Sequence, residues 1–122
     1  IEPFGFIWDD QHLKRAGLDY WELVNIQRHL NFQTYLERFP NRRLFFATTK
    51  GSVHYDQVNY GPQDALVFGP ETRGLPDDIL SLQPSHNIRI PMFAAARCLN
   101  LANSVAIILY EALRQQGYPG LV

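Results

Sequence analysis

Residues 68–76, Phe-Gly-Pro-Glu-Thr-Arg-Gly-Leu-Pro, contain the side chains of this sequence that are best placed for chemistry. They follow the apolar run 65–68, which is typical of a buried parallel strand, and ligands of open α/β sheets collect beyond the carboxyl ends of such strands. Gly69 would let the backbone approach a ligand closely. The side chains that could orient a polar ligand are Glu71, Thr72 and Arg73. A Gly-Pro step alone more often marks a plain connection.

A second stretch, residues 87–116, combines a short strand, a proline break and a long helix. We expect the strand at residues 87–90, the break at Pro91 and the helix from Leu99 or Asn100 to Gln116. Between them lies a loop that ends in Arg-Cys-Leu-Asn-Leu-Ala-Asn, residues 97–103. This loop would begin at the same edge of the sheet as residues 68–76.

The elements that position these stretches alternate between strands and helices, which predicts an α/β fold with a mostly parallel sheet flanked by helices. A buried strand is expected at residues 44–49 and a half-exposed edge strand at 23–28. Short helices are expected at residues 11–16, 32–39 and 76–82, the second capped by Asn31. Residues 52–61 are expected to form a loop or a poorly formed helix. The strand ends at Thr49, Gly69 and Pro91 would then form one crevice.

The helix at 32–39 carries large side chains at helical spacing: Phe32, Tyr35, Leu36 and Phe39. Their simplest role is in the core. A base-stacking platform beside Arg38, Arg42 and Arg43 is the alternative, although single-strand binders usually display aromatic residues on an exposed sheet or groove.

The last helix is apolar nearly all round, because residues 104–109 include five apolar side chains in six positions. One sheet covers only about half of such a helix. A second copy of the chain is the economical cover for the rest, so we expect a homodimer through this helix.

Length and composition exclude several classes of protein. With 122 residues the chain is expected to be a single domain, residues 1–122. No apolar stretch approaches the roughly 18 residues of a membrane span, and one cysteine with four scattered histidines gives no metal-ligand spacing. We therefore expect no membrane, no metal and a reducing, cytoplasmic setting. A net charge of −1 requires any nucleic-acid site to be a local patch.

Taken together, the two stretches resemble the second and third motifs of the SpoU branch of the SPOUT methyltransferases. The resemblance rests on Phe-Gly-Pro-Glu-Thr-Arg-Gly-Leu-Pro, then Arg-Ile-Pro-Met, then Arg-Cys-Leu-Asn-Leu-Ala-Asn-Ser-Val-Ala, in that order and spacing. It extends over nearly the whole chain and is strongest to members that modify the wobble nucleotide of tRNA. The resemblance implies a C-terminal deep trefoil knot, although threaded chains are exceptions to the general rules of chain connection.

The resemblance also implies a pocket for S-adenosyl-L-methionine made by loops around the knot. Carried over by position, the cofactor-binding residues would be Ala47, Gly69, Glu71, Ile90, Cys98 and Leu99, with Pro70 and Met92 beside them. Adenine needs a flat apolar slot with backbone donors and acceptors, which loops after buried strands provide. Cys98 stands where the family often has Ser; a buried structural thiol is the plainer reading, and the two are compatible.

The implied reaction is methylation of the ribose 2'-hydroxyl of the wobble cytidine or uridine of tRNA, so the partner would be a tRNA anticodon loop. Among the residues present, Arg97, Asn103 and Tyr110 are expected to support the site, while Arg97 and Asn103 could instead cap the helix. Phosphate contacts would come from Lys14, Arg15, Arg28, Arg42, Arg43 and Lys50.

The family's first motif, whose arginine is implicated in catalysis, has no counterpart among these residues. We therefore expect the 122 residues by themselves to transfer little or no methyl. The alternative function is a truncated, non-catalytic dimeric module that binds the cofactor or RNA.

Overall fold

The computed structural model describes residues 1–2, 24–96 and 99–122. The chain divides into two compact units, Ile1–Asn41 and Arg42–Val122, which are described separately. The predicted helix at residues 11–16 lies outside the described residues. No helix in the described ranges combines the length and the apolar character needed to cross a membrane.

The described part of the first unit contains one helix, α2 (Phe32–Arg38). Asn31 caps it, as predicted, because its side-chain oxygen accepts a hydrogen bond of 2.8 Å from the backbone N–H of Thr34. Tyr35 lies at the centre of a ring cluster, 5.2 Å from His29 and 5.2 Å from Phe39 between centroids. The sequence predicts that the large apolar side chains of this helix lie in the core. In the structure they are half-buried, and none of them is fully buried.

The predicted edge strand at residues 23–28 is also wrong for its described part, because residues 24–28 form no strand. Val24 and Ile26 remain 61% and 40% exposed. Alternation of apolar and polar residues makes a strand only where a neighbouring strand offers hydrogen-bond partners. Among the described residues, the backbone hydrogen bond nearest to this segment runs over 2.8 Å from Glu2 N to the carbonyl of His29.

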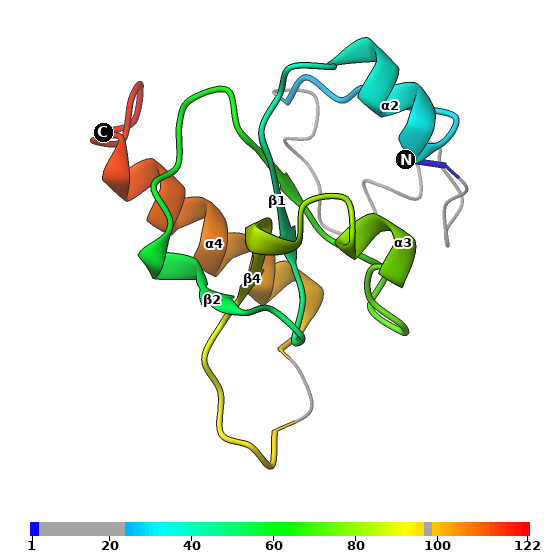
Figure 1. Cartoon of the computed structure of the whole chain (residues 1–122). Helices are drawn as coiled ribbons and strands as arrows, with labels where there is room; N and C mark the ends of the chain where they lie inside the picture. The colour runs from blue at the N-terminus through cyan, green and yellow to red at the C-terminus, as the bar shows by residue number, and fades with distance from the viewer. Residues whose placement is uncertain (3–23, 97–98) are drawn as a thin grey trace, which may run out of the picture. The chain divides into compact units, whose positions relative to one another are not determined.

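The second unit is built on a parallel sheet, as predicted (Figure 1). In the part of the chain that the structure describes, four strands lie in the order β2 (Val53–His54), β4 (Asn87–Arg89), β1 (Leu44–Ala47) and β3 (Ala65–Val67). Each neighbouring pair is parallel. The central strands β1 and β4 are paired on both sides, and each has a fully buried member, Phe46 in β1 and Ile88 in β4.

Strand β2 is missing from the sequence prediction, which has only a loop or a poorly formed helix there. It contains two residues and pairs only with β4, so it leaves almost no signal in the sequence. The 3₁₀ helix η2 (Tyr55–Gln57) that follows it matches the poorly formed helix. The helix α3 (Asp77–Leu80) and the 3₁₀ helix η3 (Pro84–His86) then lead into β4.

The longest described helix, α4 (Leu101–Gln115), packs against the sheet through Ile108 and Ala112. They meet Phe45 and Ile88, which point to the same side of β1 and β4. Phe46 points to the other side and is fully buried. Apolar residues one turn apart therefore anchor α4, and residues elsewhere on its surface stay exposed.

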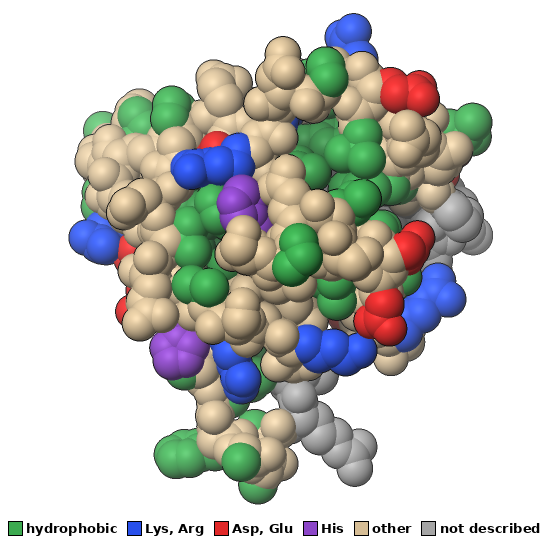
Figure 2. All heavy atoms as spheres, in the orientation of Figure 1, with side chains coloured by type: hydrophobic (Ala, Val, Ile, Leu, Met, Phe, Trp, Pro, Cys, Tyr) green, Lys and Arg blue, Asp and Glu red, His purple; other side chains and the backbone are tan. Residues whose placement is uncertain are grey.

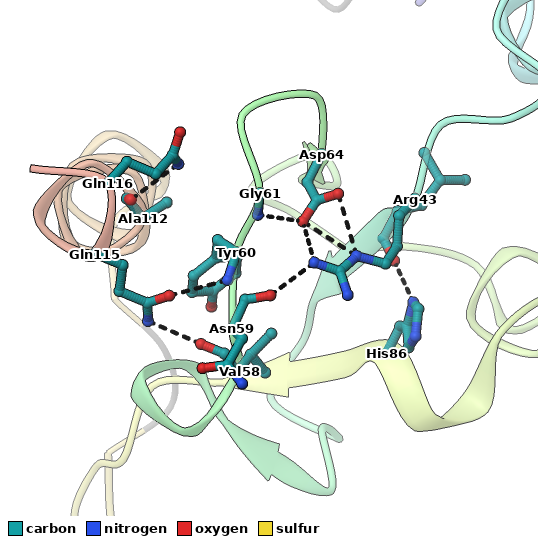
Figure 3. A network of polar contacts seen from close by, with 11 residues as sticks. Arg43, Val58, Asn59, Tyr60, Gly61, Asp64, His86, Ala112, Gln115 and Gln116 are labelled. Atoms are coloured by element: carbon teal, nitrogen blue, oxygen red, sulfur yellow. Dashed lines mark hydrogen bonds and ion pairs between the residues drawn. The ribbon is translucent and has the colours of Figure 1, made fainter. Parts of the chain in front are cut away.

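Arg43, at the start of β1, joins three segments of this unit (Figure 3). Its guanidinium donates to both carboxylate oxygens of Asp64 and donates a bond of 2.7 Å to the carbonyl of Asn59. Asp64 also accepts a bond of 2.7 Å from the backbone N–H of Gly61. Segment 58–64 is thus held to β1, and Gln115 holds it to α4 by bonding Tyr60 N at 2.9 Å and the carbonyl of Val58 at 2.8 Å.

Two glycines let the loops after β1 and β3 fold back against backbone. A Cβ on Gly51 would lie 2.6 Å from the carbonyl carbon of Ile88, and a Cβ on Gly69 would lie 2.3 Å from that of Gly74. Real Cβ atoms do not approach so closely, so both positions require glycine. For Gly69 this requirement comes from the chain's own backbone, and its predicted close approach to a ligand stays a prediction.

We expect Asp64→Asn to destabilise the protein at pH 7 by about 1–3 kcal/mol, because Arg43 loses its anionic partner. Burial alone would raise the pKa of Asp64, but hydrogen bonds from Arg43 and Gly61 and the charge of Arg43 together lower it. A carboxylate with a lowered folded-state pKa stabilises the fold above its unfolded pKa of about 4, and that stabilisation is lost as pH falls through the folded value.

Urea denaturation at a series of pH values measures this effect. Asp77→Asn is the matched control, because the Lys50 and Asp77 side chains are 71% and 86% exposed and such surface pairs contribute about 0–1 kcal/mol. Equal effects of the two substitutions, or a wild-type advantage over Asp64→Asn that persists in strong acid, would contradict the account.

We expect Gly69→Ala to destabilise the protein by about 1–3 kcal/mol, since the new methyl group must displace the backbone of residues 74–75. Gly61→Ala is the control, because its Cβ would meet Asp64 at an ordinary 3.6 Å. Denaturation midpoints at neutral pH compare the two. Equal midpoints would mean that the loop after β3 does not need glycine at position 69.

Candidate functional site

A cavity of about 330 Å³ opens where β1, β3 and β4 end. Its lining comes from residues 47–50 after β1, from 68–75 after β3 and from 88–90 at β4. Met92, Leu99 and the α4 residues Leu101, Ser104 and Ile108 complete it. Parallel strands bring their carboxyl ends to one edge of the sheet, and the cavity lies where the sequence predicts a crevice.

The loop at residues 69–75 forms one wall of the cavity. It is closed by a hydrogen bond of 2.9 Å from Gly74 N to the carbonyl of Pro70. Gly74 has a φ of 69°, a conformation that side chains disfavour. The side chains of Glu71, Thr72 and Arg73 therefore sit on a short, tightly closed turn and are exposed to solvent at the cavity.

The lining is mixed in chemistry. Its apolar part includes Ala47, Phe68, Ile88, Ile90, Met92 and Leu99. Hydroxyl groups come from Thr48, Thr49, Thr72 and Ser104, and charged groups from Lys50, Glu71, Arg73 and Arg89. A ligand with a flat apolar ring and several polar atoms suits such a lining. Among the described residues no group of three or more His, Cys, Asp or Glu could hold a metal ion.

The structure brings together most of the residues named for the cofactor. Ala47, Gly69, Glu71, Ile90 and Leu99 all line the cavity, as do Pro70 and Met92. Cys98 lies outside the described residues, as does Arg97 of the supporting set. Their binding of a cofactor stays a prediction.

The other supporting residues lie away from the cavity lining. Asn103 is exposed in the first turn of α4, and Tyr110 is 56% exposed further along the helix. The alternative that Asn103 caps the helix is wrong, because Asn100 is the cap. The Asn100 side chain accepts hydrogen bonds from the backbone of Ala102 at 2.8 Å and of Asn103 at 3.3 Å.

The residues proposed for phosphate contacts differ in their surroundings. Arg43 is held by Asp64 and Asn59, as described above, and Arg28 pairs with Glu2. Lys50 lies on the cavity and is 3.4 Å from Asp77. Lys14 and Arg15 lie outside the described residues. Arg43 is a weaker candidate for RNA than Lys50, because its partner Asp64 is mostly buried, whereas Asp77, the partner of Lys50, is 86% exposed.

Sequence reasoning missed Arg89 as a site residue. Arg89 ends β4 and lines the cavity, and its buried Nε has no hydrogen-bond partner among the described residues. The available signal was its position, since it is the last residue of a strand whose carboxyl end lies at the cavity. Its neighbour in the ladder is His54 of β2.

The chain is similar to known proteins over its whole length. Residues 1–110 match the model of the SpoU rRNA Methylase family. A tRNA (cytidine(34)-2'-O)-methyltransferase of Escherichia coli K12 is 51% identical over 123 residues, an alignment that covers 100% of this chain and 78% of that protein.

Solved structures agree with this match. One, described as giving insights into the 2-OH methylation of C/U34 on tRNA, has a TM-score of 0.88 and 40% identity and covers 95% of this chain and 76% of its own. An AdoMet-bound rRNA methyltransferase from Sinorhizobium meliloti has a TM-score of 0.71 and 29% identity, covering 82% of this chain and 39% of its own. The parallel sheet, the cavity at its strand ends and these matches agree, and the chain belongs to the SpoU rRNA methylase family.

Proposed function

We infer that this protein is a tRNA 2'-O-methyltransferase that modifies the ribose of the wobble cytidine or uridine. The observation that carries the inference is the relative 51% identical over the full chain, a tRNA (cytidine(34)-2'-O)-methyltransferase. The cavity adds support of a different kind. It is formed by loops at the carboxyl ends of the strands, which is where open α/β sheets bind ligands, and a methyltransferase needs such a place for its methyl donor.

We propose S-adenosyl-L-methionine as the cofactor of the cavity. Its volume of about 330 Å³ lies at the lower end of the range for small-molecule sites, and its apolar residues with adjoining backbone suit an adenine ring. Ala47, Gly69, Ile90 and Leu99 would hold the adenosine, and Glu71 lies where a hydroxyl or amino group could donate to it. Cys98 completes the proposed set. A solved neighbour of 29% identity binds AdoMet.

The protein's contribution to methyl transfer is orientation. When bound, S-adenosylmethionine would supply an electrophilic methyl group to the 2'-oxygen, with the thioether as the leaving group and the hydroxyl proton passing to a base or to water. The short turn at residues 69–75 keeps that side of the cavity rigid, which favours an in-line approach. Arg97, Asn103 and Tyr110 are proposed to support the nucleotide side.

We propose that the second unit has the deep trefoil knot of SPOUT proteins and that residues 1–122 form one such domain. In support, the turn at residues 68–75 and the segment that enters α4, Leu99 and Leu101, line the same cavity. A knot would explain why two stretches far apart in the sequence close around one ligand. We also propose that the protein is cytoplasmic, since a tRNA-modifying enzyme must meet its tRNA.

Methyl transfer to tRNA tests the function. We expect the protein, as its organism makes it, to transfer labelled methyl from S-adenosylmethionine to a tRNA with cytidine or uridine at the wobble position. The matched control is the same tRNA with a 2'-deoxy wobble nucleotide, which keeps the anticodon loop but lacks the acceptor oxygen. Its labelling should fall to background.

Label that persists in the deoxy substrate would place the methyl group elsewhere. Cofactor binding by calorimetry without any transfer would instead favour the non-catalytic binding module.

We further propose a homodimer through α4. Ala102, Ala106, Leu109 and Tyr110 are exposed at helical spacing, opposite the buried Ile108 and Ala112. Such a stripe is the exposed apolar surface that a two-fold pairing covers. Ile107, one of the apolar residues in 104–109, is half-buried. Leu109 is 40% exposed and is therefore the better position at which to test the interface by substitution.

Leu109→Asp should split the dimer, because an unpaired carboxylate in an interface costs about 2–5 kcal/mol. Leu82→Asp is the control, since Leu82 is 52% exposed beyond α3. Sedimentation should give twice the chain mass of 14.1 kDa for wild type and control, and the single-chain mass for Leu109→Asp. A monomeric wild type at micromolar concentration would contradict the dimer.

A further inference from the structure

The rim of the cavity is more positive than the protein as a whole. Its charged lining residues in the described part of the chain are three cations, Lys50, Arg73 and Arg89, and one carboxylate, Glu71. The whole chain has a net charge of −1. Asp77 lies 3.4 Å from Lys50, but both side chains are largely exposed, so this pair is weak and easily exchanged for another anion.

An exposed aromatic side chain follows Met92, one of the residues that line the cavity. Phe93 is 91% exposed, more than any other large hydrophobic side chain described except the terminal Val122. It starts a turn closed by a hydrogen bond of 2.9 Å from Ala96 N to its own carbonyl, and alanines follow it, so no bulky neighbour shields the ring. Figure 2 shows hydrophobic side chains at the tip of the projecting segment that is yellow in Figure 1.

The turn that carries Phe93 is continuous with the cavity wall. Met92, the preceding residue, lines the cavity, and so does Leu99 on the far side of the loop. A ring on this turn is thus one residue along the chain from the cavity lining, which is where a nucleotide adjacent to the bound ribose could reach it. Exposing a phenylalanine gives up its burial energy, about 1.5–3 kcal/mol, part of which a stacked base would restore.

Aromatic rings beside a positively charged groove are the combination by which proteins bind single-stranded nucleic acid, with bases stacked on the rings and cations along the backbone. We propose that Phe93 stacks on an unpaired base adjacent to the methylated nucleotide, while Lys50, Arg73 and Arg89 contact the phosphates that flank it. The inference rests on the proposed function and names the surface that would recognise the RNA. It assigns the stacking to Phe93 rather than to the aromatic residues of α2.

Arg89 faces no carboxylate in its described strand pairing, because it lies in register with His54 of β2. Its Nε is buried, so a phosphate would be contacted by the two outer nitrogens of the guanidinium. A second copy of the chain could also cover the Phe93 turn. The apolar stripe of α4 has the pattern of a dimer interface, however, whereas the cavity rim is cationic and suits a nucleic acid.

Binding of a tRNA anticodon stem-loop, followed by fluorescence anisotropy, tests the stacking. We expect Phe93→Ala to weaken binding roughly 5- to 150-fold, the equivalent of about 1–3 kcal/mol for one stacked base. Phe93→Tyr should bind like wild type, because it keeps a ring. Leu82→Ala, a truncation of an exposed apolar residue away from the cavity, should also bind like wild type. A fully paired duplex of the same length should bind more weakly and show no effect of Phe93→Ala.

The phosphate contacts are tested by salt dependence. Each lost contact to single-stranded nucleic acid should reduce the slope of log affinity against log salt by about 0.7. Lys50→Gln and Arg73→Gln should each do so, and both side chains are exposed, so neither should unfold the protein. Arg114→Gln is the charge-matched control, because Arg114 is exposed and not part of the cavity lining.

The outcomes separate this inference from the proposed function. Methylation of the wobble nucleotide with unchanged RNA binding in Phe93→Ala would overturn the inference and leave the function standing. Stem-loop binding that depends on Phe93, without methyl transfer, would support the inference and contradict the proposed function. Dissociation of a wild-type dimer by Phe93→Ala, measured by sedimentation, would show that a second chain covers the ring and would also overturn the inference.

Discussion

Close contact between backbone segments is the constraint on which the rest of this structure depends. In the loop after β1, Gly51 contacts the backbone of β4. In the loop after β3, Gly69 contacts the backbone of residues 74–75 in the same loop, and both contacts are too close for a Cβ. These contacts fold two loops tightly over the strand ends and leave a cavity between them. The site is therefore shaped by backbone, and its side chains are presented from rigid turns.

The same unit connects its core to this cavity through shared residues. Ile88 and Ile108 are fully buried in the core cluster and also line the cavity, so packing of α4 on the sheet fixes one wall of the site. At the opposite end of β1, Arg43 with Asp64, and Gln115 with the backbone of residues 58–60, hold the connection between β2 and β3 to both β1 and α4. Stability and site geometry are thus coupled through β1, β4 and α4.

Much of this arrangement was predictable, because β1 and β3 are continuous apolar runs and a proline break follows β4 at residue 91. The cap at Asn31, the strands at 44–47, 65–67 and 87–89 and the long last helix all follow from local patterns. Other features depend on tertiary partners that no local pattern specifies. Residues 24–28 alternate but find no ladder, β2 is two residues long, and the role of Gly69 became clear only with the backbone of residues 74–75 beside it.

Hydrogen–deuterium exchange with and without S-adenosylmethionine tests the central claim, that the strand-end cavity is the cofactor site, most directly. The account predicts that added cofactor slows exchange mainly in residues 47–50, 68–75 and 88–92, because those backbone segments form the cavity. Protection of the exposed α2 segment alone, or cofactor binding detected by calorimetry with no protection in those three loops, would contradict it.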